Sequence, residues 1–149
     1  MPLSETINQE IKLAMLARDK ERLEALRAIK AAFLLAKSEK GAQHELSDPV
    51  ELKIIQKLVK QRQDSAEIYK DQGRDDLFQK EIAEAKVIGE FMPAQMEEEE
   101  IRSYLKALIS NMGADSMQQM GPVMGRAAKE LAGKADGKLI SQLVRELLS

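Results

Sequence analysis

Apolar residues recur every three or four positions along most of the chain, which is the spacing of amphipathic helices. The pattern predicts five helices followed by two shorter ones in the tail. The five lie over residues 4–18, 19–40, 47–71, 75–90 and 97–112. The two shorter helices carry Val123 to Leu131 and Leu139 to Leu148. We therefore expect an all-α protein.

Local residues mark the ends of these helices. Ser4 and Asp19 are candidate N-terminal caps, and Pro49 suits the first turn of the third helix because that turn needs no N–H from it. Gly73 and Gly113 are expected to end the third and fifth helices, and Gly41 the second.

Each stripe also predicts buried positions. In the first two helices these are Ile7, Ile11, Ala14, Met15, Leu23, Leu26, Ile29, Ala31, Ala32, Phe33, Leu34 and Leu35. The second helix has the broader apolar surface, so we expect it to be the central one. In the next two helices the predicted positions are Val50, Ile54, Leu58, Ser65, Tyr69, Leu77, Ile82, Ala85 and Ile88. Arg62 falls within the apolar arc of the third helix.

A domain boundary is expected at Pro93. Pro93 interrupts the preceding helix, and the residues that follow it up to 96 form a short linker. Glu97 to Glu100 then place four acids in the first turn of a helix. Acidic side chains at a helix start interact favourably with the helix dipole, and this explains the four glutamates better than a metal site does. We expect an N-terminal bundle of about four helices over residues 1–93 and a small C-terminal domain of three to four helices over residues 94–149.

Composition supports a helical domain structure. The 149 residues are 44% apolar, 32% charged and only 3% aromatic, which is typical of helix bundles. The absence of cysteine excludes disulfides and thiol chemistry and fits a reducing compartment. With no signal-peptide pattern at the start and no apolar run long enough to cross a membrane, we expect a cytoplasmic protein without membrane contact.

Charge is unevenly distributed. Residues 11–62 carry 12 basic and 7 acidic side chains, residues 63–100 carry 4 and 12, and residues 101–149 carry 7 and 4. Two basic segments therefore flank an acidic one, which permits contact with a polyanion but is also typical of solvated helix surfaces.

No self-contained active site is visible in the sequence. The single histidine, His44, lies in a polar loop without cysteine or clustered carboxylates, so no catalytic triad and no metal site can be assembled. No phosphate-binding glycine loop is present, and no pair of carboxylates stands out as acid and base. We expect no catalytic residue, metal or cofactor.

The tail carries the most informative motifs, at residues 117–126 and 133–138. Gly121 and Gly125 flank Pro122, so we expect a sharp turn, a helix that restarts with Pro122 in its first turn, and a helix side open to close approach. Gly133 suits a helix stop and Asp136 a helix cap, which predicts a phosphate cradle at the last helix. The alternative is a tight helical turn whose glycines only satisfy geometry. The candidate contact residues are Gly121, Gly125, Arg126, Lys129, Lys134 and Lys138, with a secondary basic stripe of Lys53, Lys57 and Lys60.

These motifs resemble the GatB/YqeY family. The resemblance rests on residues 120–125, 133–138 and 143–148, and it extends through residues 23–30, 57–62, 64–69 and 91–96 to the stand-alone YqeY-like proteins along essentially the whole chain. In glutamine-dependent tRNA amidotransferase, the corresponding tail belongs to the GatB subunit. The resemblance implies an all-helical tail of GatB/YqeY type that contacts tRNA.

Catalysis does not carry over with the resemblance. The chain is too short to hold the catalytic core of GatB and has no amidase-type Ser-Ser-Lys arrangement, so any carbon-nitrogen ligase activity rests on the shared tail alone. We expect a tRNA-associated accessory protein of translation, with amidotransferase subunits or other translation proteins as further partners. One alternative is a protein-interaction module in which Met117, Met120 and Met124 hold a partner helix. Another is an amidotransferase component that acts only with other subunits.

Overall fold

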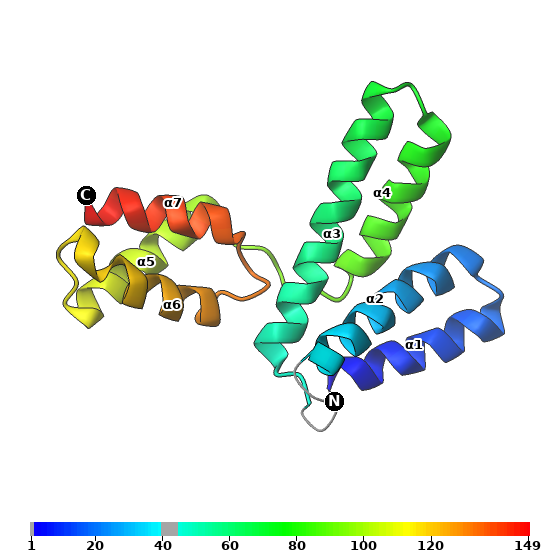
Figure 1. Cartoon of the computed structure of the whole chain (residues 1–149), viewed down its shortest axis with the longest axis horizontal. Coiled ribbons are helices and arrows are strands. Elements are labelled where there is room, and N and C mark those ends of the chain that lie inside the picture. The colour runs from blue at the N-terminus through cyan, green and yellow to red at the C-terminus, as the bar shows by residue number, and fades with distance from the viewer. Residues whose placement is uncertain (1, 40–44) are drawn as a thin grey trace. The chain divides into compact units, whose positions relative to one another are not determined.

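The computed structural model describes residues 2–39 and 45–149. Within these residues it contains seven α-helices, one short 3₁₀ helix and no strand (Figure 1), so the predicted all-α fold class is confirmed. The helices are α1 (Leu3–Ala17), α2 (Lys20–Glu39), α3 (Asp48–Asp71), α4 (Asp75–Gly89), α5 (Glu98–Met112), η1 (Met117–Gln119), α6 (Met120–Glu130) and α7 (Gly137–Leu148). None of the described helices is both long and apolar enough to cross a membrane.

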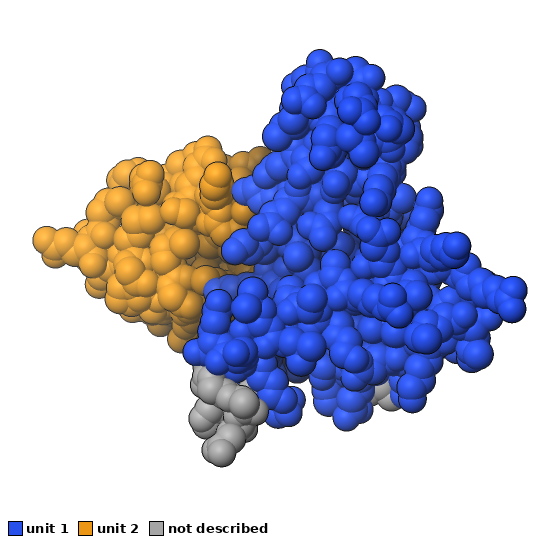
Figure 2. Space-filling view, turned by 45° about the vertical axis from the view of Figure 1, so that its right-hand side comes forward, with its two compact units in different colours: residues 1–92 blue, residues 93–149 orange. Residues whose placement is uncertain are grey.

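The chain divides into two compact units, residues 1–92 and residues 93–149 (Figure 2). In the first unit, α1 pairs with α2 and α3 pairs with α4, and α2 contacts all three of the other helices. Its buried apolar cluster consists of Ile7, Ala14, Ala25, Leu26, Ile29, Phe33, Ile55 and Ile88. The contacts of α2 thus agree with the expectation that the second helix is central to this bundle.

Most of the predicted helix ends are confirmed. Asp19 precedes α2, and its carboxylate accepts a hydrogen bond of 3.1 Å from the backbone N–H of Arg22. Pro49 lies in the first turn of α3. Gly73 and Gly113 follow the ends of α3 and α5 with φ angles of 72° and 65°, a conformation that glycine adopts without strain. The expected stop at Gly41 and the loop residue His44 lie outside the described residues.

Ser4 is not the cap of α1, contrary to the prediction. The helix begins at Leu3, and Pro2, which precedes it, provides no side-chain cap. Ser4 therefore lies within the first turn of the helix, one residue after its start. Local composition locates a helix end only to within one or two residues, which is the size of this error.

Several predicted core positions are exposed instead. Met15, Leu34, Leu35 and Ile82 each keep 40% or more of their surface in contact with solvent, and Ala31 is also exposed. Periodicity identifies an apolar face but not how much of its width another helix covers. These residues lie at the uncovered edge of that face.

The buried face of α3 differs from the predicted one by about one residue. Glu51, Ile55 and Ala66 are fully buried. The five predicted positions are all half-buried instead: Val50, Ile54, Leu58, Ser65 and Tyr69. Arg62 shares the face of these three at about 100° per residue. Two charged residues therefore lie on the innermost stripe of α3: Arg62, which the apolar arc predicted from the sequence includes, and Glu51, which it does not.

Arg62 lies inside the bundle because α4 supplies its partners. Its Nε donates to Glu84 Oε2 at 3.0 Å, and Glu81 Oε2 lies 3.9 Å away. Arg22 makes a similar link, donating to Glu10 of α1 at 3.0 Å and to Glu90, which follows α4, at 2.7 Å. The helices of the first unit are thus joined by ion pairs as well as by apolar contacts.

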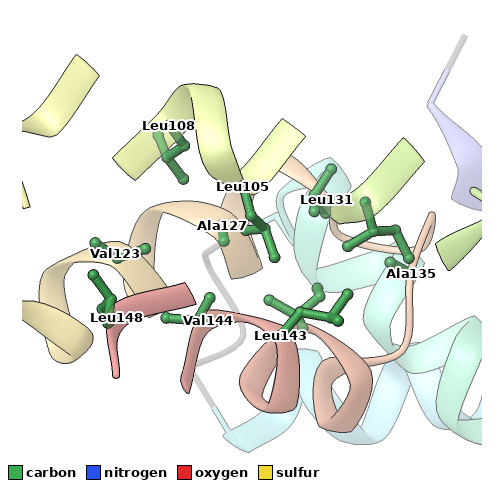
Figure 3. Close-up of a cluster of buried hydrophobic side chains, with 11 residues drawn as sticks. Leu105, Leu108, Val123, Ala127, Leu131, Ala135, Leu143, Val144 and Leu148 are labelled. Carbon is green, nitrogen blue, oxygen red and sulfur yellow. The ribbon is translucent and has the colours of Figure 1, made fainter. Parts of the chain in front are cut away.

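The second unit is built from α5, η1, α6 and α7 around one apolar cluster (Figure 3). Its fully buried members are Ile101, Leu105, Leu108, Val123, Ala127, Leu131, Ala135, Ile140, Leu143, Val144 and Leu148. Glu97 and Glu100 form a capping box at the start of α5, which accounts for two of the four consecutive acids as helix-start residues.

Candidate functional site

One exposed face of α6 brings together four of the predicted contact residues. Gly121, Gly125, Arg126 and Lys129 fall within an arc of about 140° at about 100° per residue, and all four are exposed. The opposite side of α6 carries Val123 and Ala127, which are buried against α5 and α7. The core thus fixes which side of α6 faces solvent.

The two glycines do not make the sharp turn that the sequence suggested. Because α6 begins at Met120, Gly121 and Gly125 lie inside the helix, and neither has a positive φ. Apart from its chain neighbours and the backbone of α6 itself, a Cβ atom built on either one meets no atom of the described chain within 4 Å. Glycine inside a helix costs about 1 kcal/mol relative to alanine. The fold therefore gives no reason for glycine at these positions.

Three of the predicted cations have no anionic partner in the described chain. Lys129, Lys134 and Lys138 are exposed, and none takes part in an ion pair among the residues that the structure places. Arg126 differs, because its Nε donates to Glu130 Oε1 one turn later at 3.0 Å. That pair is exposed and therefore contributes little to stability, so Arg126 is available to exchange Glu130 for another anion.

A turn of buried backbone connects α6 to α7 and carries Lys134. Gly133 has a φ of 76° and is buried. It lies in the turn as expected, although α6 itself ends at Glu130 with Leu131 as its cap. The side chain of Lys134 is exposed on this turn. Lys134 and Lys138 are thus held by the turn and the first residues of α7, whereas Arg126 and Lys129 belong to α6.

The linker before α5 holds this turn in place. Gln95 Nε2 donates to the carbonyl of Gly133 at 2.7 Å, and the backbone N–H of Met96 donates to the carbonyl of Lys134 at 2.9 Å. Sequence reasoning did not identify Gln95 as a structural residue. No local pattern reports a contact between side chain and backbone across 38 positions.

The start of α7 is already occupied by a carboxylate. Asp136 Oδ1 accepts from the backbone N–H of Lys138 at 3.2 Å, which confirms Asp136 as the cap. A negative charge at these amides opposes the binding of a second anion there. The lysine ammonium groups, and not the helix amides expected as a phosphate cradle, are the groups on this surface that attract an anion.

The methionines of the tail are mostly part of the core. Met120 and Met124 are half-buried and pack against the buried cluster of the second unit, whereas Met117 is 41% exposed. Two of the three methionines thus contribute to the core of this unit, and Met117 alone among them is exposed. The protein-interaction alternative therefore gains no specific support from this surface.

The secondary basic stripe lies on the first unit. Lys53, Lys57 and Lys60 follow one face of α3 and are all exposed, and none forms an ion pair with another described residue. No group of three or more described His, Cys, Asp or Glu side chains is arranged to hold a metal ion.

The C-terminal unit is thus a small helical domain with an exposed basic surface. Comparison with known proteins identifies the family of the whole chain. The model of the family described as Yqey-like protein matches residues 4–148, and the chain belongs to that family. The resemblance found in the sequence is confirmed at this level.

Two curated relatives are similar over most of the chain, and both are named altered inheritance of mitochondria protein 41, mitochondrial. The one from Pyrenophora tritici-repentis (strain Pt-1C-BFP) is 28% identical over 146 residues, covering 95% of this chain and 78% of the relative. The one from Clavispora lusitaniae (strain ATCC 42720) is 29% identical over 133 residues, covering 87% and 76%.

These names correct the expected location. The prediction of a cytoplasmic protein is contradicted by relatives that are named as mitochondrial. Its physical basis was weak, because a lack of cysteine fits any reducing compartment and does not distinguish one from another.

Proposed function

We propose that this YqeY-family chain is a tRNA-associated accessory protein whose C-terminal unit contacts the RNA backbone through α6 and the turn that follows it. The observation that carries the proposal is the exposed face of α6, where Gly121 and Gly125 leave backbone uncovered beside Arg126 and Lys129. Glycines that the fold does not require are explained if another molecule approaches the helix closely at these positions.

The chemistry of this surface favours a phosphate backbone as the ligand. Lys129, Lys134 and Lys138 present ammonium groups without a carboxylate partner among the described residues, and Arg126 adds a guanidinium. Phosphate contacts of this kind give binding that depends on backbone charge more than on sequence. Aromatic residues make up only 3% of the chain, which disfavours reading of unstacked bases.

Titration of the full chain with tRNA at several salt concentrations tests the proposal. Four cations that release counterions give a slope of log affinity against log salt of about −3, so affinity should fall about 60-fold between about 50 and 200 mM salt. The double variant Lys134→Glu/Lys138→Glu should abolish binding under the same conditions.

The basic stripe of α3 supplies a matched control. Lys53→Glu/Lys57→Glu makes the same change in net charge on the first unit, also at exposed positions. We expect this control to retain most of the affinity and the salt slope. Binding that responds equally to both double variants would indicate attraction to net charge, and binding that ignores salt and both variants would rule the proposal out.

The link to glutamine-dependent amidotransferase rests on the resemblance of the tail and needs its own test. We expect no ligase activity from the chain alone. In a reconstituted reaction that transfers ammonia to a mischarged tRNA, adding the chain should change the yield only if it acts as an accessory component. An unchanged yield together with intact tRNA binding would remove the amidotransferase part and leave the tRNA part standing.

A further inference from the structure

A hollow of about 300 Å³ opens in the first unit, among α1, α2 and the start of α3. Its apolar wall includes the buried side chains of Ile7 and Phe33 and the exposed side chain of Leu34. A volume at the low end of the range for ligand pockets suits a small molecule. The exposed leucine at its edge is one of the apolar residues that no described helix covers.

A buried acidic residue, Glu51, lines the hollow. Glu51 is 4% exposed and is the one charged residue that is fully buried in the described chain. Its carboxylate accepts a hydrogen bond from the backbone N–H of Ser4, but no lysine or arginine among the described residues forms an ion pair with it. A buried carboxylate without a cationic partner is costly, and a cationic group that reached it would reduce that cost.

A positive group lines the same hollow. Lys30 is exposed, faces the hollow and takes part in none of the ion pairs of the described residues. The second lysine of the lining, Lys37, is already paired with Glu45 at 3.1 Å. Apart from the Lys37–Glu45 pair and the solvent-exposed Glu5, the hollow therefore offers one buried negative group and one positive group, neither of which has an ionic partner among the described residues.

We infer that this hollow binds a small zwitterion with an apolar body, of the class of free α-amino acids with aliphatic or aromatic side chains. The ligand ammonium would pair with Glu51, its carboxylate with Lys30, and its side chain would contact Ile7, Phe33 and Leu34. An organic cation without a carboxylate leaves Lys30 unpaired, and an organic anion without an ammonium meets Glu51. The presence of both signs therefore selects for a ligand that carries both.

This inference does not depend on the proposed RNA contact, because every residue in it belongs to the first unit. The test uses the full chain, with isothermal titration and ligand-observed NMR. The probes are leucine, methionine and phenylalanine, together with two analogues of leucine. One analogue, 3-methylbutylamine, lacks the carboxylate, and the other, 4-methylpentanoate, lacks the ammonium. We expect saturable binding of at least one amino acid and at least about tenfold weaker binding of each analogue.

Two variants then assign the charges. Glu51→Gln should weaken amino-acid binding at least about tenfold and remove the preference over 4-methylpentanoate. Lys30→Gln should remove the preference over 3-methylbutylamine. Glu67→Gln and Lys57→Gln, at exposed positions of α3, are matched controls that should bind like the unaltered chain.

The outcomes are separable even if Glu51→Gln folds poorly, because Lys30 is exposed and its replacement leaves the core unchanged. Circular dichroism of each variant checks helix content. No saturable binding of any of the three amino acids up to about 10 mM would overturn the inference. So would equal binding of leucine and both analogues, or affinities that neither variant changes.

Discussion

The carboxylate of Glu51, in the first turn of α3, accepts a hydrogen bond from the backbone N–H of Ser4, in the first turn of α1. The start of α1 has no side-chain cap from its own neighbours, because Pro2 precedes it. The exposed amides at a helix start need acceptors, and here one acceptor comes from another helix. Glu51 thus caps α1 through tertiary structure.

Burial raises the pKa of Glu51 above its ordinary value of 4.5, and the nearby carboxylate of Asp48 raises it further, while the Ser4 amide lowers it. The native carboxyl therefore holds its proton more tightly than the unfolded one. The contribution of Glu51 to stability is fully present below pH 4.5 and is lost as the pH rises through the raised pKa.

Glu51→Gln should therefore gain stability relative to the unaltered chain as the pH rises from about 4 to about 7, because the amide can still accept from Ser4 and carries no charge. Urea unfolding at the two pH values measures the difference. Glu67→Gln, at an exposed position of the same helix, should show no such trend. A stability difference that is the same at both pH values would contradict the assignment.

The pair of Arg62 and Glu84 should behave as a coupled unit. The two side chains are 23% and 13% exposed, with Nε and Oε2 3.0 Å apart. Arg62→Met leaves Glu84 and Glu81 in a poorly solvated site, so we expect a loss of about 1–3 kcal/mol. The double variant Arg62→Met/Glu84→Gln should recover part of that loss in a double-mutant cycle. Strictly additive losses would show that the contact does not couple α3 to α4.

Gln95 should control the order of the turn between α6 and α7. Replacing Gln95 with alanine removes the donor to the Gly133 carbonyl, and we expect a loss of about 1 kcal/mol. Hydrogen exchange localises the effect, because the Met96 amide is protected by the Lys134 carbonyl and should exchange faster in the variant. An unchanged exchange rate at Met96 would mean that the linker holds the turn without Gln95.

Features decided by neighbouring residues could be predicted from the sequence. Gly73 and Gly113 follow the ends of helices and Gly133 lies in a turn, because their left-handed backbone favours glycine, and Asp136 caps a helix whose amides lie within reach of its own side chain. The exposure of Arg126 and Lys129 could also be predicted, because Val123 and Ala127 mark the apolar face of α6 and the two cations lie away from that face.

Features decided by distant partners could not be predicted. The sequence pattern does not predict the burial of Glu51, and it places Arg62 within the apolar arc of α3 without a partner. Ser4 and Glu84 offset the cost of burying these two residues, and neither partner can be identified from spacing along the chain. Leu34 and Leu35 fit an apolar stripe but are exposed, because the width that a neighbouring helix covers is a property of packing. The expected helix with Pro122 in its first turn is confirmed by α6, whereas the expected sharp turn at Gly121 is wrong, because Gly121 lies within that first turn.

The glycines of α6 provide the sharpest test of whether this surface serves binding. Gly121→Ala and Gly125→Ala add a methyl group that meets no described atom within 4 Å beyond the chain neighbours and the α6 backbone, so each should stabilise the chain by about 0.5–1 kcal/mol through the higher helix propensity of alanine. If RNA approaches the bare backbone, the same changes should weaken tRNA binding although no charge is altered. Thermal unfolding and tRNA titration of the same samples measure both effects.

The exposed position Ser103 of α5 offers a comparison for this prediction. Ser103→Ala also improves helix propensity but lies on another helix, so it should raise stability slightly and leave tRNA affinity unchanged. Stability that rises in the glycine variants with no loss of affinity would show that α6 tolerates side chains in the complex, and the contact would then rest on the lysines alone. Stability that falls would show instead that the glycines serve the fold. A gain in stability with a loss of affinity is the result expected of a surface where backbone is left bare for a ligand.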